Sequence, residues 1–325
     1  MHDRDPRSLP PRVPRPAPPR TLPTPSLDAA ATPLVTPIPG DDEHRAVTFL
    51  WRGEAREVRV LANKLTHDTD AALMERTGDV WHRTYVVRRG WRASYRLRVD
   101  GVDLPDPLNP RSWNGFSVAG TAPPSPWLAP PAAPRHKLSR HPTGHRYEPV
   151  RAPRGTLVML DGEDWTYDLP VILDNLIEAG AIPPVTAWLV ESGPDRARRL
   201  TCDPGFVDGL PYDGATVIAG QSFGGLAAVY AAHRRPDRFA AALSQSGSFW
   251  WPNGPEPEWL TGELSRDAPP RVHLQVGTLE WALRGPTARL RERLGEAGTY
   301  VEFEGGHDRY CWRDELAEGL IAIYG

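Results

Sequence analysis

One short segment constrains the fold of this chain more than any other. The run Gly220-Gln221-Ser222-Phe223-Gly224-Gly225 follows an apolar stretch at 216–219 and precedes a helical stretch at 226–232. A Gly-x-Ser-x-Gly motif alone arises by chance in roughly one of several chains of this size, but a strand, a sharp turn and a helix around it are typical of the nucleophile elbow of an α/β-hydrolase. The glycines are needed because side chains there would collide with the turn. We therefore expect Ser222 to be a nucleophile.

The surrounding sequence from 151 to 325 has the pattern of an α/β domain, in which short apolar runs alternate with helical segments. The runs are nearly continuous in apolar residues, which favours parallel strands buried on both faces. The predicted strands are 156–160, 185–190, 216–219, 241–244, 272–276 and 300–303. The predicted helices are 169–179, 226–233, 286–294 and 312–323.

The first half of the chain has a different pattern. Residues 41–120 contain β-rich, partly alternating runs separated by turns that contain glycine, which predicts a small β-sandwich. Residues 1–40 hold a dozen prolines and few large apolar residues, which predicts a disordered arm. Residues 121–150 are proline-rich and polar, as expected of a linker leading into the α/β domain.

Composition excludes several classes of function. A formal net charge of −3 and a sequence pI near 6.4 give no basic field, so we expect no nucleic-acid partner. The two cysteines, Cys202 and Cys311, lack the spacing of a metal or redox site. The N-terminus lacks the apolar core of a signal peptide, and there is no run of about 18 apolar residues. These features indicate a cytoplasmic protein without a membrane partner, either a monomer or a weak homo-oligomer.

A serine hydroxyl needs a base and an acid to act as a nucleophile. His307 is the preferred base because it lies between the last predicted strand and the last helix, although a turn histidine without a catalytic role is the alternative. Glu280, at the end of the preceding strand, is the favoured acid, with Asp308 as its rival. The expected oxyanion donors are the backbone N–H groups of Phe223 and Gly162.

Several separate motifs, in order, resemble the enterochelin (enterobactin) esterase family. In the α/β domain they are Leu160-Asp161-Gly162-Glu163-Asp164-Trp165, 219–225, 243–251, Gly305-Gly306-His307-Asp308 and Cys311-Trp312-Arg313. In the β-rich region they are Trp51-Arg52-Gly53, 60–63, 80–84 and 106–110. The resemblance covers most of residues 46–325. It implies an early-set immunoglobulin-like domain followed by a hydrolase that opens the ester backbone of a ferric catecholate siderophore in the cytoplasm, with iron present only as part of the substrate and no cofactor or metal of the protein's own.

The chain departs from the family pattern in two places. Only residues 191–215 join two predicted parallel strands where the family has a long helix, so any helix here must be short. Arg199 also replaces an acid of the family's Arg-x-x-Glu-Leu motif. In addition, residues 136–154 are polar and interrupted by proline, so one or two edge strands are expected to be missing or irregular.

An iron tris-catecholate is a bulky aromatic anion, which arginine and tryptophan side chains can bind by charge and stacking. Arg196 and Arg198 are candidates for this role, and a solvated loop is the alternative for both. Weaker candidates for lining the pocket are Glu163, Trp165, Trp250 and Trp251, and for the three tryptophans core packing is the alternative.

Three functions remain open from the sequence. The first is a siderophore esterase, and the second is an esterase of the same chemistry that acts on another carboxylic ester, because the motif does not select the acyl group. The third is a siderophore-binding homologue with weak turnover.

Overall fold

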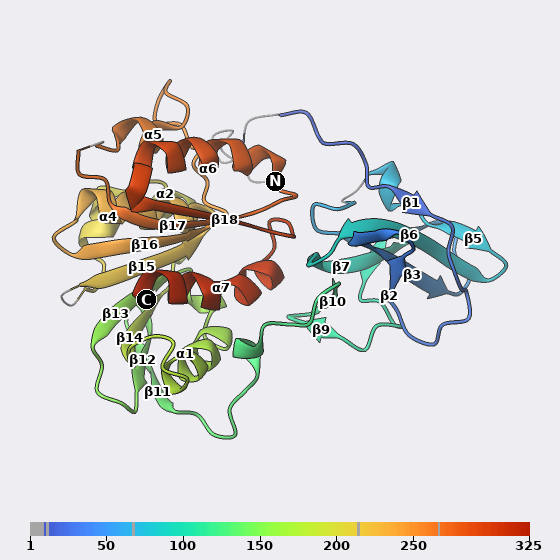
Figure 1. The fold of residues 1–325 in the computed structure, drawn as a ribbon, viewed down its shortest axis with the longest axis horizontal. Coiled ribbons are helices and arrows are strands. Elements are labelled where there is room, and N and C mark those ends of the chain that lie inside the picture. Colours follow the sequence, from blue (N-terminus) through green and yellow to red (C-terminus); the bar gives the residue numbers. More distant parts are fainter. Residues whose placement is uncertain (1–9, 11–12, 67–68, 213–214, 266) are drawn as a thin grey trace.

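The chain forms two parts, a β-sandwich and an α/β domain (Figure 1). The structure is a computed structural model, and it describes residues 10, 13–66, 69–212, 215–265 and 267–325. The predicted fold class, an α/β-hydrolase preceded by a small sandwich, is confirmed. Within the described residues, no helix combines the length and apolar character needed to cross a membrane.

In the part of the chain that the structure describes, the sandwich consists of two antiparallel sheets of five strands each. The first sheet contains β1 (Thr21–Leu22), β2 (Leu34–Ile38), β3 (Asp41–Arg52), β5 (Glu75–Thr77) and β6 (Val80–Arg88). The second contains β4 (Val58–Ala62), β7 (Arg92–Val99), β8 (Val102–Leu104), β9 (Ser112–Trp113) and β10 (Phe116–Gly120). Side chains alternate between the core and the outside, so that Val58, Val60 and Ala62 are fully buried while Arg59 is not.

The expectation of a disordered arm over residues 1–40 is wrong for its second half. Strand β1 pairs with β6, and β2 pairs with β3 at the edge of the first sheet. The prolines that suggested disorder are compatible with this position, because an edge strand can carry a residue such as Pro37 that has no N–H to donate. The sandwich therefore begins near Thr21.

The α/β domain is built on one sheet, in which the described residues form eight strands. Its order is β11-β12-β14-β13-β15-β16-β17-β18, in which β11 and β12 are antiparallel and the other six strands run parallel. The strands are β11 (His136–His141), β12 (Gly144–Pro149), β13 (Gly155–Leu160), β14 (Val185–Val190), β15 (Thr216–Gln221), β16 (Phe239–Gln245), β17 (Arg271–Gly277) and β18 (Gly298–Phe303). The six predicted strands correspond to the six parallel ones.

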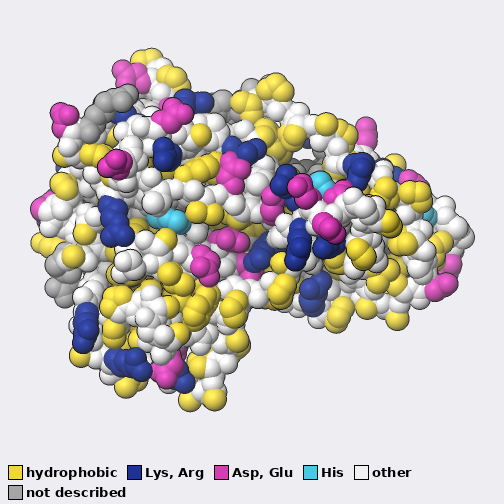
Figure 2. Space-filling model, viewed as in Figure 1, with side chains coloured by type: hydrophobic (Ala, Val, Ile, Leu, Met, Phe, Trp, Pro, Cys, Tyr) yellow, Lys and Arg dark blue, Asp and Glu magenta, His cyan; other side chains and the backbone are white. Residues whose placement is uncertain are grey.

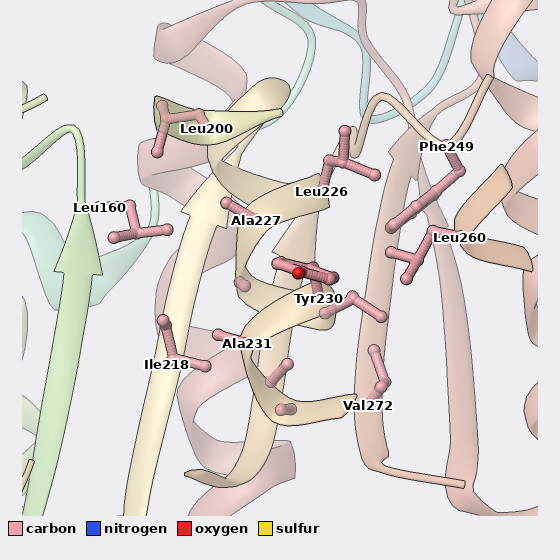
Figure 3. Close-up of a cluster of buried hydrophobic side chains, with 14 of the residues drawn as sticks. Leu160, Leu200, Ile218, Leu226, Ala227, Tyr230, Ala231, Phe249, Leu260 and Val272 are labelled. Atoms are coloured by element: carbon pink, nitrogen blue, oxygen red, sulfur yellow. The ribbon is translucent and has the colours of Figure 1, made fainter. Parts of the chain in front are cut away.

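Helices cover both faces of this sheet. On one face, α1 (Asp168–Glu178) and α7 (Arg309–Tyr324) bury a core that includes Leu173 and Leu316. On the other face, the core is drawn in Figure 3, where Leu226 and Tyr230 of the helix that follows β15 lie against the sheet. The helices that contribute to this second core are α2 (Arg196–Leu200), α3 (Pro204–Asp208), α4 (Phe223–Arg234), α5 (Trp259–Glu263) and α6 (Trp281–Leu294).

Residues 136–154 do not lack regular strands, contrary to expectation. Strands β11 and β12 form a hairpin that pairs residue by residue from His136–Pro149 to His141–Gly144. They look irregular in sequence because only one of their faces meets the core, through Tyr147, whereas Arg146 points to the other side. The linker predicted over 121–150 therefore ends near Pro134.

The crossover over 191–215 is short, as expected, and its described residues contain two helices, α2 and α3, of five residues each. Leu200 of α2 and Val207 of α3 belong to the core on this face of the sheet, and Trp188 of β14 packs against the same core. Trp188 of β14 is half-buried there, beneath the Arg146 guanidinium at 5.1 Å and the His141 ring at 4.8 Å. Long polar side chains thus cover the apolar surface that a longer helix would cover.

All three glutamines of the chain form one buried row across the central strands. Gln221, Gln245 and Gln275 lie in register at the carboxyl ends of β15, β16 and β17. The amide of Gln221 donates to Gln245 at 3.0 Å, and that of Gln245 donates to Gln275 at 2.7 Å. The row continues to the Trp165 indole N–H on one side at 2.9 Å and to the Glu315 carbonyl on the other at 3.0 Å.

Replacing the middle amide should destabilise the α/β domain. Gln245→Met keeps the length of the side chain but orphans a donor on Gln221 and an acceptor on Gln275, so we expect the free energy of unfolding to fall by about 2–4 kcal/mol. Urea unfolding monitored by circular dichroism measures this change. Leu243→Met, two residues earlier on the same buried face, is the matched control and should cost less than about 1.5 kcal/mol. An equal loss in both variants would contradict a role for the amide row.

Candidate active site

Ser222 occupies a strained turn between β15 and α4. Its φ of 57° and ψ of −119° lie outside the regions that residues with a side chain usually adopt. Two backbone hydrogen bonds hold this conformation: the Ser222 N–H donates to the Gln245 carbonyl at 3.0 Å, and the Ser248 N–H donates to the Ser222 carbonyl at 3.0 Å. The geometry is that of a nucleophile elbow, in which the hydroxyl stands at the end of the strand.

The glycines around Ser222 permit this close packing. A Cβ on Gly220 would lie 2.4 Å from the Gly224 carbonyl oxygen, and a Cβ on Gly225 would lie 2.5 Å from the buried Ser244 hydroxyl. Both distances are far shorter than van der Waals contact. The collision expected from the sequence therefore exists at both positions.

His307 lies between Ser222 and Glu280, in the loop between β18 and α7. Its Nε2 is 3.1 Å from the Ser222 hydroxyl oxygen, and its Nδ1 is 2.6 Å from Glu280 Oε1. The ring also meets Trp312 of α7 edge to face, with centroids 4.9 Å apart and planes at 88°. Contacts on both nitrogens and one ring edge fix the orientation of the imidazole.

Glu280 is completely buried, and each of its carboxylate oxygens accepts a hydrogen bond. Oε1 faces His307, while Oε2 accepts from the Gly277 N–H and from the Ser246 hydroxyl, both at 2.6 Å. The Trp312 indole N–H donates to the Ser246 oxygen at 2.8 Å, which directs the hydroxyl hydrogen toward Glu280. Sequence reasoning missed Ser246, although a polar run at the end of an apolar strand is a signal that could have found it.

Asp308, the rival acid, points away from the His307 ring. Its Oδ1 accepts from the Tyr310 N–H at 3.0 Å and caps helix α7, and its Oδ2 accepts from the Ser94 N–H of the sandwich at 2.6 Å. Burial raises the pKa of this carboxyl, and the two backbone hydrogen bonds oppose that rise. Of the two candidates, Glu280 alone contacts the imidazole.

The two expected oxyanion donors lie at the starts of short helical segments. Phe223 is the first residue of α4, and Gly162 begins a 3-10 turn over Gly162–Asp164, so neither N–H has a partner within its own helical segment. Gly162 has no room for a side chain, because a Cβ there would lie 2.2 Å from the Leu189 carbonyl carbon. The preceding residue, Asp161, adopts the left-handed conformation with φ at 52°.

Arg196 is engaged with Asp161 rather than free. Its Nε and Nη2 donate to the two carboxylate oxygens, each at 2.6 Å, and its guanidinium carbon lies 5.9 Å from the centre of the Phe223 ring. Ser192 also donates to Asp161 at 2.6 Å. This cluster ties the loop that carries Gly162 to Phe223, so Arg196 is paired and does not offer an unpaired positive charge.

The other expected substrate contacts are spread out. Arg198 is exposed and pairs with Asp203 at 2.6 Å. It lines a pocket of about 550 Å³ whose walls do not include Ser222, His307 or Glu280. Glu163 is exposed and accepts from the Ser192 N–H at 3.2 Å. Trp165 and Trp250 are buried in the two cores of the α/β domain, which is the alternative that the sequence left open for them, and Trp251 is half-buried against the same core as Trp250.

Neither cysteine is placed to act as a nucleophile. Both are free thiols, and burial raises the pKa of Cys202 to about 12 and that of Cys311 well above its usual value. Thiolate formation is therefore disfavoured at both positions near neutral pH. The hydroxyl beside His307 Nε2 is that of Ser222.

Adding one methyl group in the elbow should test its packing. Gly225→Ala places a Cβ against the Ser244 hydroxyl and 3.0 Å from the Gly247 Cα, so we expect a loss of about 1–3 kcal/mol in the free energy of unfolding. Gly262→Ala is the matched control, because Gly262 is also helical and has nothing within 4 Å of the added carbon. Chemical denaturation compares the two variants. Equal free energies of unfolding for the two variants would contradict the close packing around Gly225.

The chain is similar to known proteins over most of its length. Residues 46–114 match the family described as enterochelin esterase, N-terminal, and residues 208–323 match the family described as putative esterase. The iron(III) enterobactin esterase of Dickeya dadantii is 30% identical over 89% of this chain and 89% of its own length. The corresponding protein of Escherichia coli O6:H1 is 31% identical over 87% of this chain and 92% of its own.

A solved structure of an enterobactin esterase has a fold similar to that of this chain. The enterobactin esterase of Shigella flexneri, crystallised in the presence of enterobactin, has a TM-score of 0.74 and 28% identity, and the match covers 91% of this chain and 96% of that one. Similarity of this extent includes both the sandwich and the α/β domain. The chain therefore belongs to the enterochelin esterase family.

Proposed function

We propose that this protein is a serine esterase that hydrolyses the trilactone backbone of ferric catecholate siderophores such as enterobactin. The observation that carries the proposal is the continuous hydrogen-bonded chain from Glu280 through His307 to Ser222. These three hydrogen-bonded residues occur in a protein whose relatives are named iron(III) enterobactin esterases. Cutting the ester backbone would weaken the grip of the siderophore on its iron.

In the proposed reaction, His307 Nε2 takes the proton of Ser222 as the hydroxyl oxygen attacks an ester carbonyl. Glu280 stabilises the imidazolium, and the N–H groups of Phe223 and Gly162 stabilise the oxyanion. His307 then gives the proton to the departing serine alcohol of the substrate. A water molecule, activated by the same histidine, hydrolyses the acyl-enzyme and restores Ser222.

The proposed steps use side-chain and backbone groups of the protein together with one water molecule. Iron enters and leaves with the siderophore as part of the substrate, and we assign no resident cofactor or metal. We place the reaction in the cytoplasm, where a ferric chelate with cut ester bonds can be reduced and its iron released.

Variants of the hydrogen-bonded chain test the mechanism. Ser222→Ala and His307→Ala should lower kcat on the order of 10⁴- to 10⁶-fold, and Glu280→Gln on the order of 10³- to 10⁴-fold because the imidazole loses its anionic partner. Asp308→Asn should lose less than about tenfold, since asparagine also caps helices. The measurement is product formation from ferric enterobactin by liquid chromatography. Unchanged turnover in Ser222→Ala or His307→Ala, or a larger loss in Asp308→Asn than in Glu280→Gln, would contradict the assignment.

A substrate panel tests the siderophore. Arg196 is paired with Asp161 and two candidate tryptophans are buried, so these side chains do not by themselves identify the substrate. Relative rates on different esters test the specificity directly. We expect kcat/KM for a ferric catecholate trilactone to exceed that for a simple aryl ester, with mass spectrometry identifying the cleaved products. The reverse order would indicate an esterase for another carboxylic ester. Tight siderophore binding without turnover would indicate a binding homologue.

A further inference from the structure

The loop that carries His307 is held from outside the α/β domain. It runs from the end of β18 to the start of α7, and the sandwich donates three hydrogen bonds to it. The Arg92 N–H donates to the Glu304 carbonyl at 3.1 Å, the Asn63 side-chain amide to the His307 carbonyl at 2.9 Å, and the Ser94 N–H to the Asp308 carboxylate at 2.6 Å. The acceptors follow one another along the loop.

The three donors belong to one rigid part of the sandwich. Arg92 and Ser94 lie on β7, and Asn63 directly follows β4, which pairs with β7. The Asn63 N–H donates to the Ser94 carbonyl at 3.3 Å, which joins the two segments beside the loop. The donors therefore move with the second sheet as a unit.

The sandwich is also fastened to helix α7, next to this loop. Charged side chains of both signs gather where the two parts of the molecule meet (Figure 2). Arg92 and Asp314 form an ion pair of 2.6 Å in this region, and the Asp314 side chain is almost completely buried. A buried ion pair of this kind fixes the relative placement of its two elements, because separating the charges would leave each without compensation.

Asn63 packs closely against the loop that carries His307. A Cβ on Gly306 would lie 2.9 Å from Asn63 Oδ1 and 2.7 Å from the Lys64 side chain. Asn63 Oδ1 is buried without a hydrogen-bond partner among the described residues, so only the amide nitrogen of this side chain contributes a bond. That nitrogen donates to the carbonyl of His307 itself, which limits rotation of the peptide that follows the histidine.

We propose that Asn63 is a positioning residue that keeps the imidazole of His307 aligned between Glu280 and Ser222. The inference rests on the proposed serine mechanism and assigns the sandwich a part in it. The Nε2 to hydroxyl distance of 3.1 Å leaves little tolerance, because a shift of about 1 Å in a reacting group costs on the order of 10²-fold in rate. Asn63 touches neither substrate nor the reacting atoms in this role.

Two substitutions at Asn63 test the proposal. Asn63→Ala removes the donor, and Asn63→Asp keeps the size of the side chain but places a carboxylate oxygen against the His307 carbonyl; the second variant provides the test if alanine unfolds the sandwich. Asn109→Ala and Asn109→Asp are the matched controls. Asn109 is also a half-buried asparagine of the sandwich, and its amide also donates to a backbone carbonyl, that of Val118 at 2.9 Å, but away from the histidine loop.

The readouts are the rate at which a serine-directed fluorophosphonate labels Ser222, located by peptide mass spectrometry, and kcat and KM for a simple aryl ester. We expect the Asn63 variants to lose about ten- to a hundredfold in labelling rate and in kcat, with KM within about twofold. The Asn109 variants should unfold at lower urea concentration yet label at the wild-type rate while folded.

Each alternative outcome is informative. Wild-type labelling in the Asn63 variants, a loss confined to KM, or an equal loss in the Asn109 variants would overturn the positioning role. Absence of Ser222 labelling in the wild-type protein would overturn the serine mechanism and this inference with it. Labelling that depends on Asn63, in a protein that does not cleave catecholate siderophores, would support the positioning role and refute only the proposed substrate.

Discussion

The buried carboxylate of Glu280 is the constraint on which the rest of the site depends. An ionised group without solvent contact is tolerated only where hydrogen bonds and charges compensate for lost hydration. Glu280 obtains this compensation from Gly277, Ser246 and His307, which come from three different segments. The need to satisfy one charge therefore brings the ends of β16, β17 and β18 together, and this arrangement places the imidazole beside Ser222.

The parallel sheet explains why these residues meet. Ser222, Ser246, Glu280 and His307 each follow the carboxyl end of one of four adjacent strands, β15 to β18, so they emerge along one edge of the sheet. The sandwich closes the same edge from the other side through its contacts with the His307 loop. The site is thus formed by loops that follow adjacent parallel strands, and the sheet fixes the spacing between these loops.

The parallel strands, the elbow and the order of Ser222, Glu280 and His307 could be predicted from the sequence, because apolar runs and glycine spacing act locally. The edge hairpin could not, since polar strands with one solvated face give no continuous apolar run. Nor could the contact of Asn63 with His307, which joins residues 244 positions apart in the chain. The pairing of Arg196 with Asp161 likewise depends on how the short crossover packs, so a cation that seemed free in sequence is neutralised in the fold.

The row of glutamines has a direction. At one end the Trp165 indole can only donate, and at the other end the Glu315 carbonyl can only accept, so every amide between them has a single permitted orientation. Turning any one amide would set oxygen against oxygen on one side and nitrogen against nitrogen on the other. The three amides must therefore form or break their pattern together, as a single cooperative unit. Because Gln221 and Gln245 directly precede Ser222 and Ser246, this unit gives the edge of the sheet that carries Ser222 a fixed polarity before any ligand arrives.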